Sequence, residues 1–295
     1  MTHPLKKAVL ALIRRTSTDL PEDVEHALRQ AAKSEEGAAA GVLETILENV
    51  AVARQEGVPI CQDTGTPIFY ALLPPGQSAY HLRMTIQENI AEATRLAYLR
   101  PNAVHPLTGV NSGNNLGDDS FPLLHIREGH EETLVLDLLL KGGGCENVGA
   151  QYSLPCADLK AGRDLDGVRR CVLHAVHQAQ GQGCAPGILG VAIGGDRASG
   201  YAASKEVLLR SLEDRHPDPI LAELEQRIST EANQLGIGPM GFGGRTTILA
   251  TKIAALHRLP ASYFVSVSYM CWACRRRRLT FGKQGASIDG RELEA

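Results

Sequence analysis

Residues 187–200 read GILGVAIGGDRASG, an apolar run that ends in two glycines and a polar turn. A short apolar segment between turn-forming residues is typical of a strand that is buried on both faces. The residues that follow, from about 198 to 211, have the pattern of a helix. This order of strand, glycine-rich turn and helix indicates an α/β protein.

Apolar strands next to polar, glycine-rich turns recur along the chain. Because loops at strand ends are where a rigid scaffold presents reactive groups, these turns are candidates for a functional site. They occupy residues 61–66, 141–147, 183–187 with 194–200, and 236–246.

The remaining pattern predicts mixed sheets flanked by helices, with a helical N-terminal segment over residues 1–57. Further helices are expected near 82–99, 165–180 and 218–234, a polar loop over 109–120, and strands near 68–73, 122–126, 133–140 and 262–270. We expect one domain over residues 1–295, with residues 276–295 as a C-terminal tail.

Composition limits the possible partners. Hydrophobic residues make up 43% of the chain and charged residues 21%, an ordinary soluble globular composition. The net charge of −3 gives no general attraction to nucleic acid or to an anionic membrane, and no apolar run approaches the roughly 18 residues of a membrane span. The only run of like charge, Arg275–Arg278, is expected to be a solvated terminus or a subunit surface. We therefore expect neither a nucleic-acid nor a membrane partner.

The chain contains seven cysteines, and this odd count without a secretion signal favours reduced thiols in the cytoplasm. Cys61, Cys184 and Cys271 each lie where a strand-like run meets a polar turn. They are too far apart in sequence for a local zinc or ferredoxin-type motif, but one site could be assembled from them in three dimensions. The alternative for any one of them is a small buried apolar residue, and Cys156 and Cys171 fit that alternative well.

Two glycine clusters could bind an anion through backbone N–H groups: KGGGCEN at 141–147 and GPMGFGGRT at 238–246. Neither has the spacing of a dinucleotide-binding or P-loop motif, and close backbone packing is the alternative for both. His105 and His257 lie near predicted loops and are candidates for substrate contact, although structural histidines are more common.

Taken together, the motifs of this chain resemble those of the class I fumarases, and they occur in the same order. The chain is most similar to the α-type subunit of the oxygen-sensitive iron–sulfur hydro-lyases, a family that also includes L-tartrate dehydratase. The resemblance covers residues 20 to 280. Its five motifs are CQDTGT, KGGGCEN, GCAPGILGVAIGG, GIGPMGFGG and SYMCWACRR.

The resemblance implies a 4Fe–4S cluster that is held by Cys61, Cys184 and Cys271 and has one iron without a thiolate. An iron that is open in this way acts as a Lewis acid instead of only transferring electrons. Two positions depart from the family pattern. Cys145 stands where many fumarases have serine, and Cys274 is an extra thiol that leaves a swap with Cys271 open.

The implied reaction is the reversible hydration of fumarate to L-malate, a step of the tricarboxylic acid cycle. The resemblance implies that Asp63 acts on the leaving or entering hydroxyl, as a hydrogen-bonding partner or as a proton carrier. It assigns Gln62, Arg100 and the backbone of Gly143 and Gly144 to the substrate carboxylates. Arginine suits this role because its planar fork matches a carboxylate. His257 is a further candidate for substrate binding.

The family's active site also needs a second domain or β subunit, which supplies the proton-abstracting base. Since the chain stops at Ala295, soon after the last cysteine motif, we expect it to hold half of an active site within a hetero- or homo-oligomer.

Two other functions stay open. The chain could be an L-tartrate dehydratase α subunit, which converts tartrate to oxaloacetate, with mesaconate as a minor third substrate. It could also be a non-catalytic subunit that binds a cluster as a redox sensor. Thr66 with its apolar continuation, and the acidic GGGCEN, favour fumarate. The presence of Asp63, Gln62 and Arg100 argues against a sensor, which needs none of them.

Overall fold

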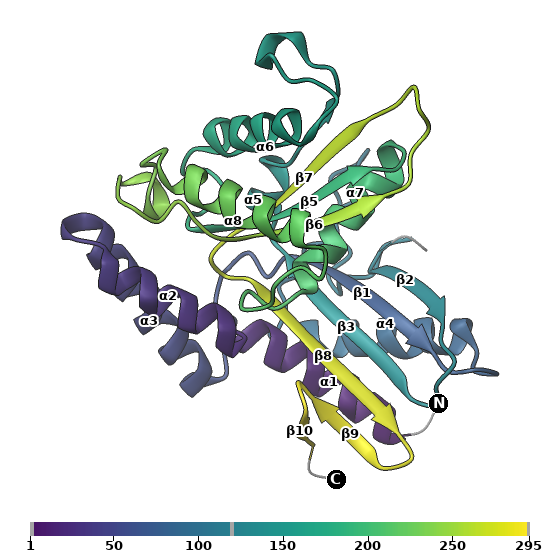
Figure 1. Ribbon diagram of the computed structural model, residues 1–295. Helices are drawn as coiled ribbons and strands as arrows, with labels where there is room; N and C mark the ends of the chain where they lie inside the picture. Colours follow the sequence, from purple (N-terminus) through teal and green to yellow (C-terminus); the bar gives the residue numbers. More distant parts are fainter. Residues whose placement is uncertain (1–2, 119–120, 294–295) are drawn as a thin grey trace. The chain divides into compact units, whose positions relative to one another are not determined.

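The computed structural model describes residues 3–118 and 121–293, and the chain divides into two compact units (Figure 1). Residues 119–120 of the polar loop expected over 109–120, and residues 294–295 of the expected tail, lie outside this description. Unit 1 comprises the described parts of Met1–Pro21, Asn49–Gly142 and Arg275–Ala295, and unit 2 comprises Glu22–Glu48 and Gly143–Cys274.

Unit 1 is built on a six-stranded mixed sheet with the order β10-β9-β8-β3-β1-β2. β1 pairs in parallel with β2, and every other pair is antiparallel. The strands are β1 (Thr66–Leu73), β2 (Leu123–Glu128), β3 (Leu134–Lys141), β8 (Arg275–Gly282), β9 (Gly285–Ile288) and β10 (Arg291–Glu292).

Helices α1 (His3–Thr18) and α4 (Ala79–Arg95) pack against this sheet, and α3 (Gly37–Glu56) enters unit 1 at Asn49. Alternate residues of β3 form the core with the apolar stripes of the two helices, as the period of two in a strand requires. The main members of this core are Val9, Leu12, Ile13, Leu82, Ile86, Ile90, Phe69, Leu136, Leu138 and Leu140, all of them buried.

The prediction that Arg275–Arg278 forms a solvated terminus or a subunit surface is wrong for Arg275 and Arg276, whereas Arg277 is partly exposed and Arg278 is exposed. These residues begin β8, which lies between β3 and β9, and Arg275 and Arg276 are 0% and 7% exposed. Arg278 bonds the carboxylate of Asp137 at 2.7 and 2.9 Å, and Arg277 bonds Asp19 at 2.9 Å. These arginines can lie in a sheet because aspartates that are distant in the sequence accept hydrogen bonds from the guanidinium groups of Arg277 and Arg278.

Unit 2 contains a four-stranded sheet with the order β4-β7-β5-β6, in which β5 is parallel to β6 and antiparallel to β7. β5 is buried along its whole length, as the sequence predicts. The mixed α/β fold with a helical N-terminal segment is therefore confirmed. The strands are β4 (Ala150–Ser153), β5 (Gly187–Gly194), β6 (Ile248–Leu256) and β7 (Phe264–Met270).

Aspartates cap the N-termini of three helices of unit 2. Asp164, Asp196 and Asp218 each accept backbone N–H groups of the helix that follows, which satisfies donors that the helix itself leaves open. Those helices are α6 (Leu165–Ala179), α7 (Arg197–Glu206) and α8 (Pro219–Asn233). The unit also contains α2 (Glu22–Ser34), the short α5 (Gly143–Asn147), and the 3₁₀ turns η1 (Ala157–Leu159), η2 (Val207–Leu209) and η3 (Pro239–Gly241).

Gly190 allows α7 to approach β5 closely. A Cβ atom at this position would lie 2.0 Å from the carbonyl oxygen of Ser204. We expect Gly190→Ala to lower the unfolding free energy by about 1–3 kcal/mol, the usual effect of overpacking. Gly41→Ala, in α3 with nothing within 4 Å of the added atom, is the matched control and should be neutral or slightly stabilising. Urea unfolding of both variants tests this, and equal effects would contradict it.

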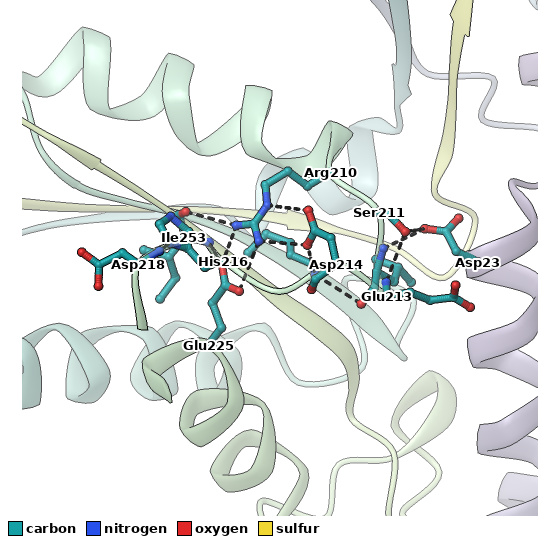
Figure 2. Close-up of polar contacts among 11 residues, drawn as sticks. Asp23, Arg210, Ser211, Glu213, Asp214, His216, Asp218, Glu225 and Ile253 are labelled. Atoms are coloured by element: carbon teal, nitrogen blue, oxygen red, sulfur yellow. Dashed lines mark hydrogen bonds and ion pairs between the residues drawn. The ribbon is translucent and has the colours of Figure 1, made fainter. Parts of the chain in front are cut away.

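A network of charged groups fixes the loop between α7 and α8 in unit 2 (Figure 2). Arg210 donates to Asp214 at 2.9 Å and to Glu225 at 2.6 Å, and Glu225 also accepts from the backbone N–H of Ile253 at 2.7 Å. Lys252 is buried and donates to the carboxylate of Asp214 at 2.6 Å. The loop is thus anchored to β6 in two ways. Lys252 of β6 bonds Asp214, and Arg210 bonds Glu225, which in turn accepts the N–H of Ile253 in β6.

This network makes stability depend on pH. Burial raises the pKa of Asp214, but hydrogen bonds from Arg210 and Lys252 outweigh it and hold the pKa below its ordinary value. The stabilising contribution is therefore present at neutral pH and is lost as the pH falls below about 4 and through the depressed pKa.

Asp214→Asn should lower the unfolding free energy at pH 7 by about 1–2 kcal/mol, since solvent screens this partly exposed carboxylate. Chemical denaturation of the variant and the wild type at pH 7 and pH 3 should show a smaller difference at pH 3. A difference that stays the same at both pH values would contradict the assignment.

Among the described residues, no helix combines the length and the apolar character that crossing a membrane requires.

Candidate functional site

In unit 1, the CQDTG motif forms a tight turn that leads into β1. Cys61 is partly exposed and Gln62 is exposed. One oxygen of Asp63 accepts the backbone N–H of Gly65 at 3.0 Å. Gly65 has a positive φ of 81°, and a Cβ atom there would lie 2.8 Å from the backbone of Lys141. The glycine is therefore required for the turn to lie against the end of β3.

Arg100 is tied to the same turn by two contacts. Its backbone N–H donates to the hydroxyl of Thr64 at 3.1 Å, and its guanidinium donates to the carbonyl of Gln62 at 3.2 Å. Thr64 is buried and also accepts from Asn102 at 3.0 Å. The side chain of Arg100 is largely exposed, so its remaining N–H groups are accessible. The structure thus brings Cys61, Gln62, Asp63 and Arg100 together in one corner of unit 1.

The carboxylate of Asp63 also reaches the end of β3. A Cβ atom at Gly142 would lie 2.9 Å from the second oxygen of Asp63, so a side chain there would displace this carboxylate. The next two residues, Gly143 and Gly144, are exposed and begin α5 in unit 2.

In unit 2, Cys184 and Cys271 lie on neighbouring turns. The backbone N–H of Trp272 donates to the carbonyl of Cys184 at 3.2 Å, and both thiols are partly exposed. Cys184 has a positive φ of 55°, a conformation that residues other than glycine rarely adopt and that is concentrated at functional sites. The structure therefore brings together two of the three cysteines that the resemblance assigns to the metal.

Tyr269 supports the turn that carries Cys184. Cβ atoms at Gly183 and Gly187 would lie 2.5 Å and 2.2 Å from its ring, so both glycines are needed for the ring to pack there. Burial, and after it the neighbouring Cys271, Cys145 and Cys184, raise the pKa of the Tyr269 phenol. Tyr269 stands beside these thiols as a neutral group. Tyr269 lies within the SYMCWACRR motif, but the sequence alone indicates no role for it.

The glycine-rich segment 236–246 packs on the same turn. The backbone N–H of Met240 donates to the carbonyl of Ala185 at 2.8 Å. The segment is held at its other end by Glu35, a buried carboxylate that accepts the backbone N–H groups of Arg245 at 2.8 Å and Thr246 at 2.5 Å. Nothing in the sequence indicated that Glu35 binds this segment, because Glu35 lies about two hundred residues before Arg245 and Thr246.

His257 is exposed just beyond the end of β6 in unit 2, and His105 lies in unit 1. The ring of His105 accepts the backbone N–H groups of Leu107 and Thr108, both at 3.3 Å, which gives it a structural role in its own loop.

Three of the other four cysteines differ from the candidate ligands in burial, whereas Cys156 is partly exposed, as the candidate ligands are. Cys145, Cys171 and Cys274 are buried, and burial, with Cys156 nearby, raises the pKa of Cys171 to about 12. A thiol with such a pKa is unreactive. Cys274 is 0% exposed, whereas Cys271 is partly exposed, which favours Cys271 as the ligand of the C-x-x-C pair. Within the described residues, no group of three His, Cys, Asp or Glu side chains is arranged to hold a metal ion.

Comparisons with known proteins identify the family of the chain. A family model described as fumarate hydratase (fumerase) matches residues 6–280. The chain is 50% identical over 278 residues to a Geobacillus stearothermophilus protein named "Putative fumarate hydratase class I", and this match covers 92% of the chain and 54% of that protein. It is 30% identical over 283 residues to the L(+)-tartrate dehydratase subunit alpha of Escherichia coli K12, covering 94% of the chain and 90% of that subunit.

The chain thus spans about half the length of the Geobacillus relative and nearly all of the Escherichia coli subunit. Since the family model matches most of the residues, the chain belongs to the fumarate hydratase family.

Proposed function

We propose that this chain is the α-type part of a class I fumarate hydratase, which hydrates fumarate reversibly to L-malate. The observation that carries the proposal is the corner of unit 1, where one tight turn presents the thiol of Cys61 and the carboxylate of Asp63 next to the guanidinium of Arg100. A structural turn requires its glycine, but it requires neither an accessible thiol nor an accessible guanidinium.

We further propose that Cys61, Cys184 and Cys271 hold one 4Fe–4S cluster. The donor set fits this group because all three thiols are partly exposed, and two of them lie on turns joined by a backbone hydrogen bond. When bound, a cluster with one iron lacking a thiolate supplies a Lewis acid for the hydroxyl of malate.

The chain's own residues would orient the substrate and move a proton. Arg100 would bind a substrate carboxylate, together with Gln62 and the backbone N–H groups of Gly143 and Gly144. His257 would be a further residue that contacts the substrate. Asp63 would accept or donate a proton at the hydroxyl oxygen that leaves as water. Its carboxylate is held for this by the N–H of Gly65 and by the space at Gly142.

The proton on the neighbouring carbon would be removed by a base from a β-type subunit or domain. Two comparisons support such a partner. The Escherichia coli relative is named as a subunit alpha, and the Geobacillus relative is about twice as long as the matched region. We place the assembly in the reducing cytoplasm, as part of the tricarboxylic acid cycle, and expect it to be sensitive to oxygen, as a cluster with one iron lacking a thiolate would be.

The test is to purify the chain anaerobically together with its partner and to assay fumarate hydration at 240 nm. The proposal predicts activity that depends on both chains and is lost in air, together with bound iron and sulfide. An inactive, air-stable protein that contains zinc or no metal would contradict it.

L-tartrate dehydratase is the second candidate, because the relative from Escherichia coli carries that name. The same preparation should be offered L-tartrate and mesaconate at equal concentrations. We expect the ratio kcat/KM for fumarate to exceed those for both. A higher ratio for tartrate would reverse the substrate assignment without removing the cluster, and a bound cluster without turnover of any of the three would identify a redox sensor.

A further inference from the structure

Arg275 is a buried cation that has no hydrogen-bonding partner in the part of the chain that the structure describes. Its side chain is 0% exposed, and none of its three guanidinium nitrogens is bonded to another group there. Arginine does not lose its proton in a protein, so burial cannot neutralise it. Burying an unpaired charge is strongly unfavourable, and an anion that is missing from the chain itself would remove this cost.

The position of Arg275 indicates where that anion lies. Arg275 is opposite Leu140 in the β3–β8 pair, and Leu140 belongs to the apolar core of unit 1. Its Nη2 is 3.8 Å from the position that a Cβ atom would take at Gly142, and the second oxygen of Asp63 is 2.9 Å from the same point. The charge is therefore buried in the corner that also contains Cys61 and Asp63. The carboxylate of Asp63 is a nearby negative charge, but the guanidinium makes no hydrogen bond to it.

We propose that Arg275 is the buried counter-charge of the iron–sulfur centre that Cys61 helps to hold, and that it favours the more reduced state of that centre; this rests on the proposed function. A centre with thiolate ligands carries net negative charge, and nearby charges and solvent exposure set its reduction potential. In a low-dielectric interior, a fixed charge acts over several ångströms without contact.

Arg275 does not have the properties of a substrate-binding residue. Since it is completely buried in the described chain, a dicarboxylate has no exposed surface of this side chain to approach. Arg100, in the same unit, is exposed and has N–H groups available for that purpose. Arg275 is therefore a positioning residue that tunes the centre, and not a catalytic residue.

The test compares Arg275→Met, Arg275→Lys and the control Arg278→Met, all in the full chain. Arg278 lies on the same strand, but its side chain is 61% exposed and paired with Asp137. Three quantities are measured: the unfolding temperature without metal, the midpoint potential after anaerobic reconstitution with iron and sulfide, and the rate of bleaching in air.

We expect Arg275→Met to raise the unfolding temperature of the metal-free chain, because it removes a buried unpaired charge. In the reconstituted chain it should shift the one-electron equilibrium about tenfold toward the oxidised centre, which is about 59 mV to a lower potential. It should also bleach several-fold faster. Arg275→Lys keeps the charge and should stay near the wild type, as should Arg278→Met.

Each other outcome identifies a different error. If wild type and Arg275→Met share the same potential and bleaching rate, the counter-charge role is wrong and the proposed function stands. If Arg275→Met is destabilised or does not fold, the side chain has a structural role and the proposal is wrong. If the wild type takes up no iron and sulfide, the proposed function fails, and this inference fails with it.

Discussion

Replacing Cys184 by serine should remove the bound iron and sulfide and reduce the hydration rate to background. Cys184 is held next to Cys271 by the N–H of Trp272, and its turn is fixed by the close packing of Tyr269 on Gly183 and Gly187. A serine oxygen fits the same space, but it replaces the thiolate that iron–sulfur clusters require. The fold should therefore be kept while the centre is lost. Iron and sulfide analysis of anaerobically prepared protein measures the effect.

Cys274→Ser is the matched control, because Cys274 is buried and belongs to the same C-x-x-C pair as Cys271. It should keep the wild-type content of iron and sulfide, whereas Cys61→Ser and Cys271→Ser should behave like Cys184→Ser. If Cys274→Ser lost the cluster and Cys271→Ser kept it, the two thiols would have to exchange roles. Retention of the cluster in Cys184→Ser would contradict the ligand assignment.

Asp63→Asn should lower kcat by about 10²–10⁴, the usual range for losing a positioned acid–base group. Asparagine has nearly the same shape and can still accept the N–H of Gly65, so the turn should keep its geometry. What is lost is the capacity to carry a proton at the substrate hydroxyl. Steady-state kinetics and metal analysis should be done on the same sample, since the expected result is low turnover with unchanged iron content.

The control for this substitution is Asp158→Asn, in the exposed η1 turn of unit 2, which should leave kcat and KM unchanged. A loss of iron in Asp63→Asn would show that Asp63 is needed for the iron–sulfur centre to bind, and not for proton transfer. Turnover within threefold of the wild type would exclude Asp63 as the proton carrier.

Local sequence pattern predicted most of the elements well. The apolar run of β5, the N-terminal helices and the helical patterns of α6 and α8 are all short-range signals. β8 was misjudged because a run of four arginines indicates solvent exposure when it is considered alone. The aspartates that neutralise part of the run, Asp19 and Asp137, are far away in the sequence. β6 was missed, although its burial against α8 and β5 is clear in the structure.

For the site, too, local sequence motifs identified candidate residues, whereas contacts between residues that are distant in the sequence could not be predicted. The sequence identified accessible thiols at strand ends, and the structure places Cys184 and Cys271 on neighbouring turns. Thr64 and Tyr269 lie inside the recognised motifs, but their contacts with Arg100 and with the Cys184 turn depend on packing. The burial of Arg275 could not be inferred from charge patterning, because it follows from the pairing of β3 with β8.

We propose that three cysteines of this chain bind one iron–sulfur centre that has a metal corner free for substrate. A Mössbauer spectrum of the chain reconstituted anaerobically with iron-57 tests it most directly, recorded with and without fumarate. We expect about four irons and four sulfides per chain, with a single iron site whose signal shifts when fumarate binds. A spectrum in which all irons are alike and unaffected by fumarate, or a preparation that retains no iron, would contradict it.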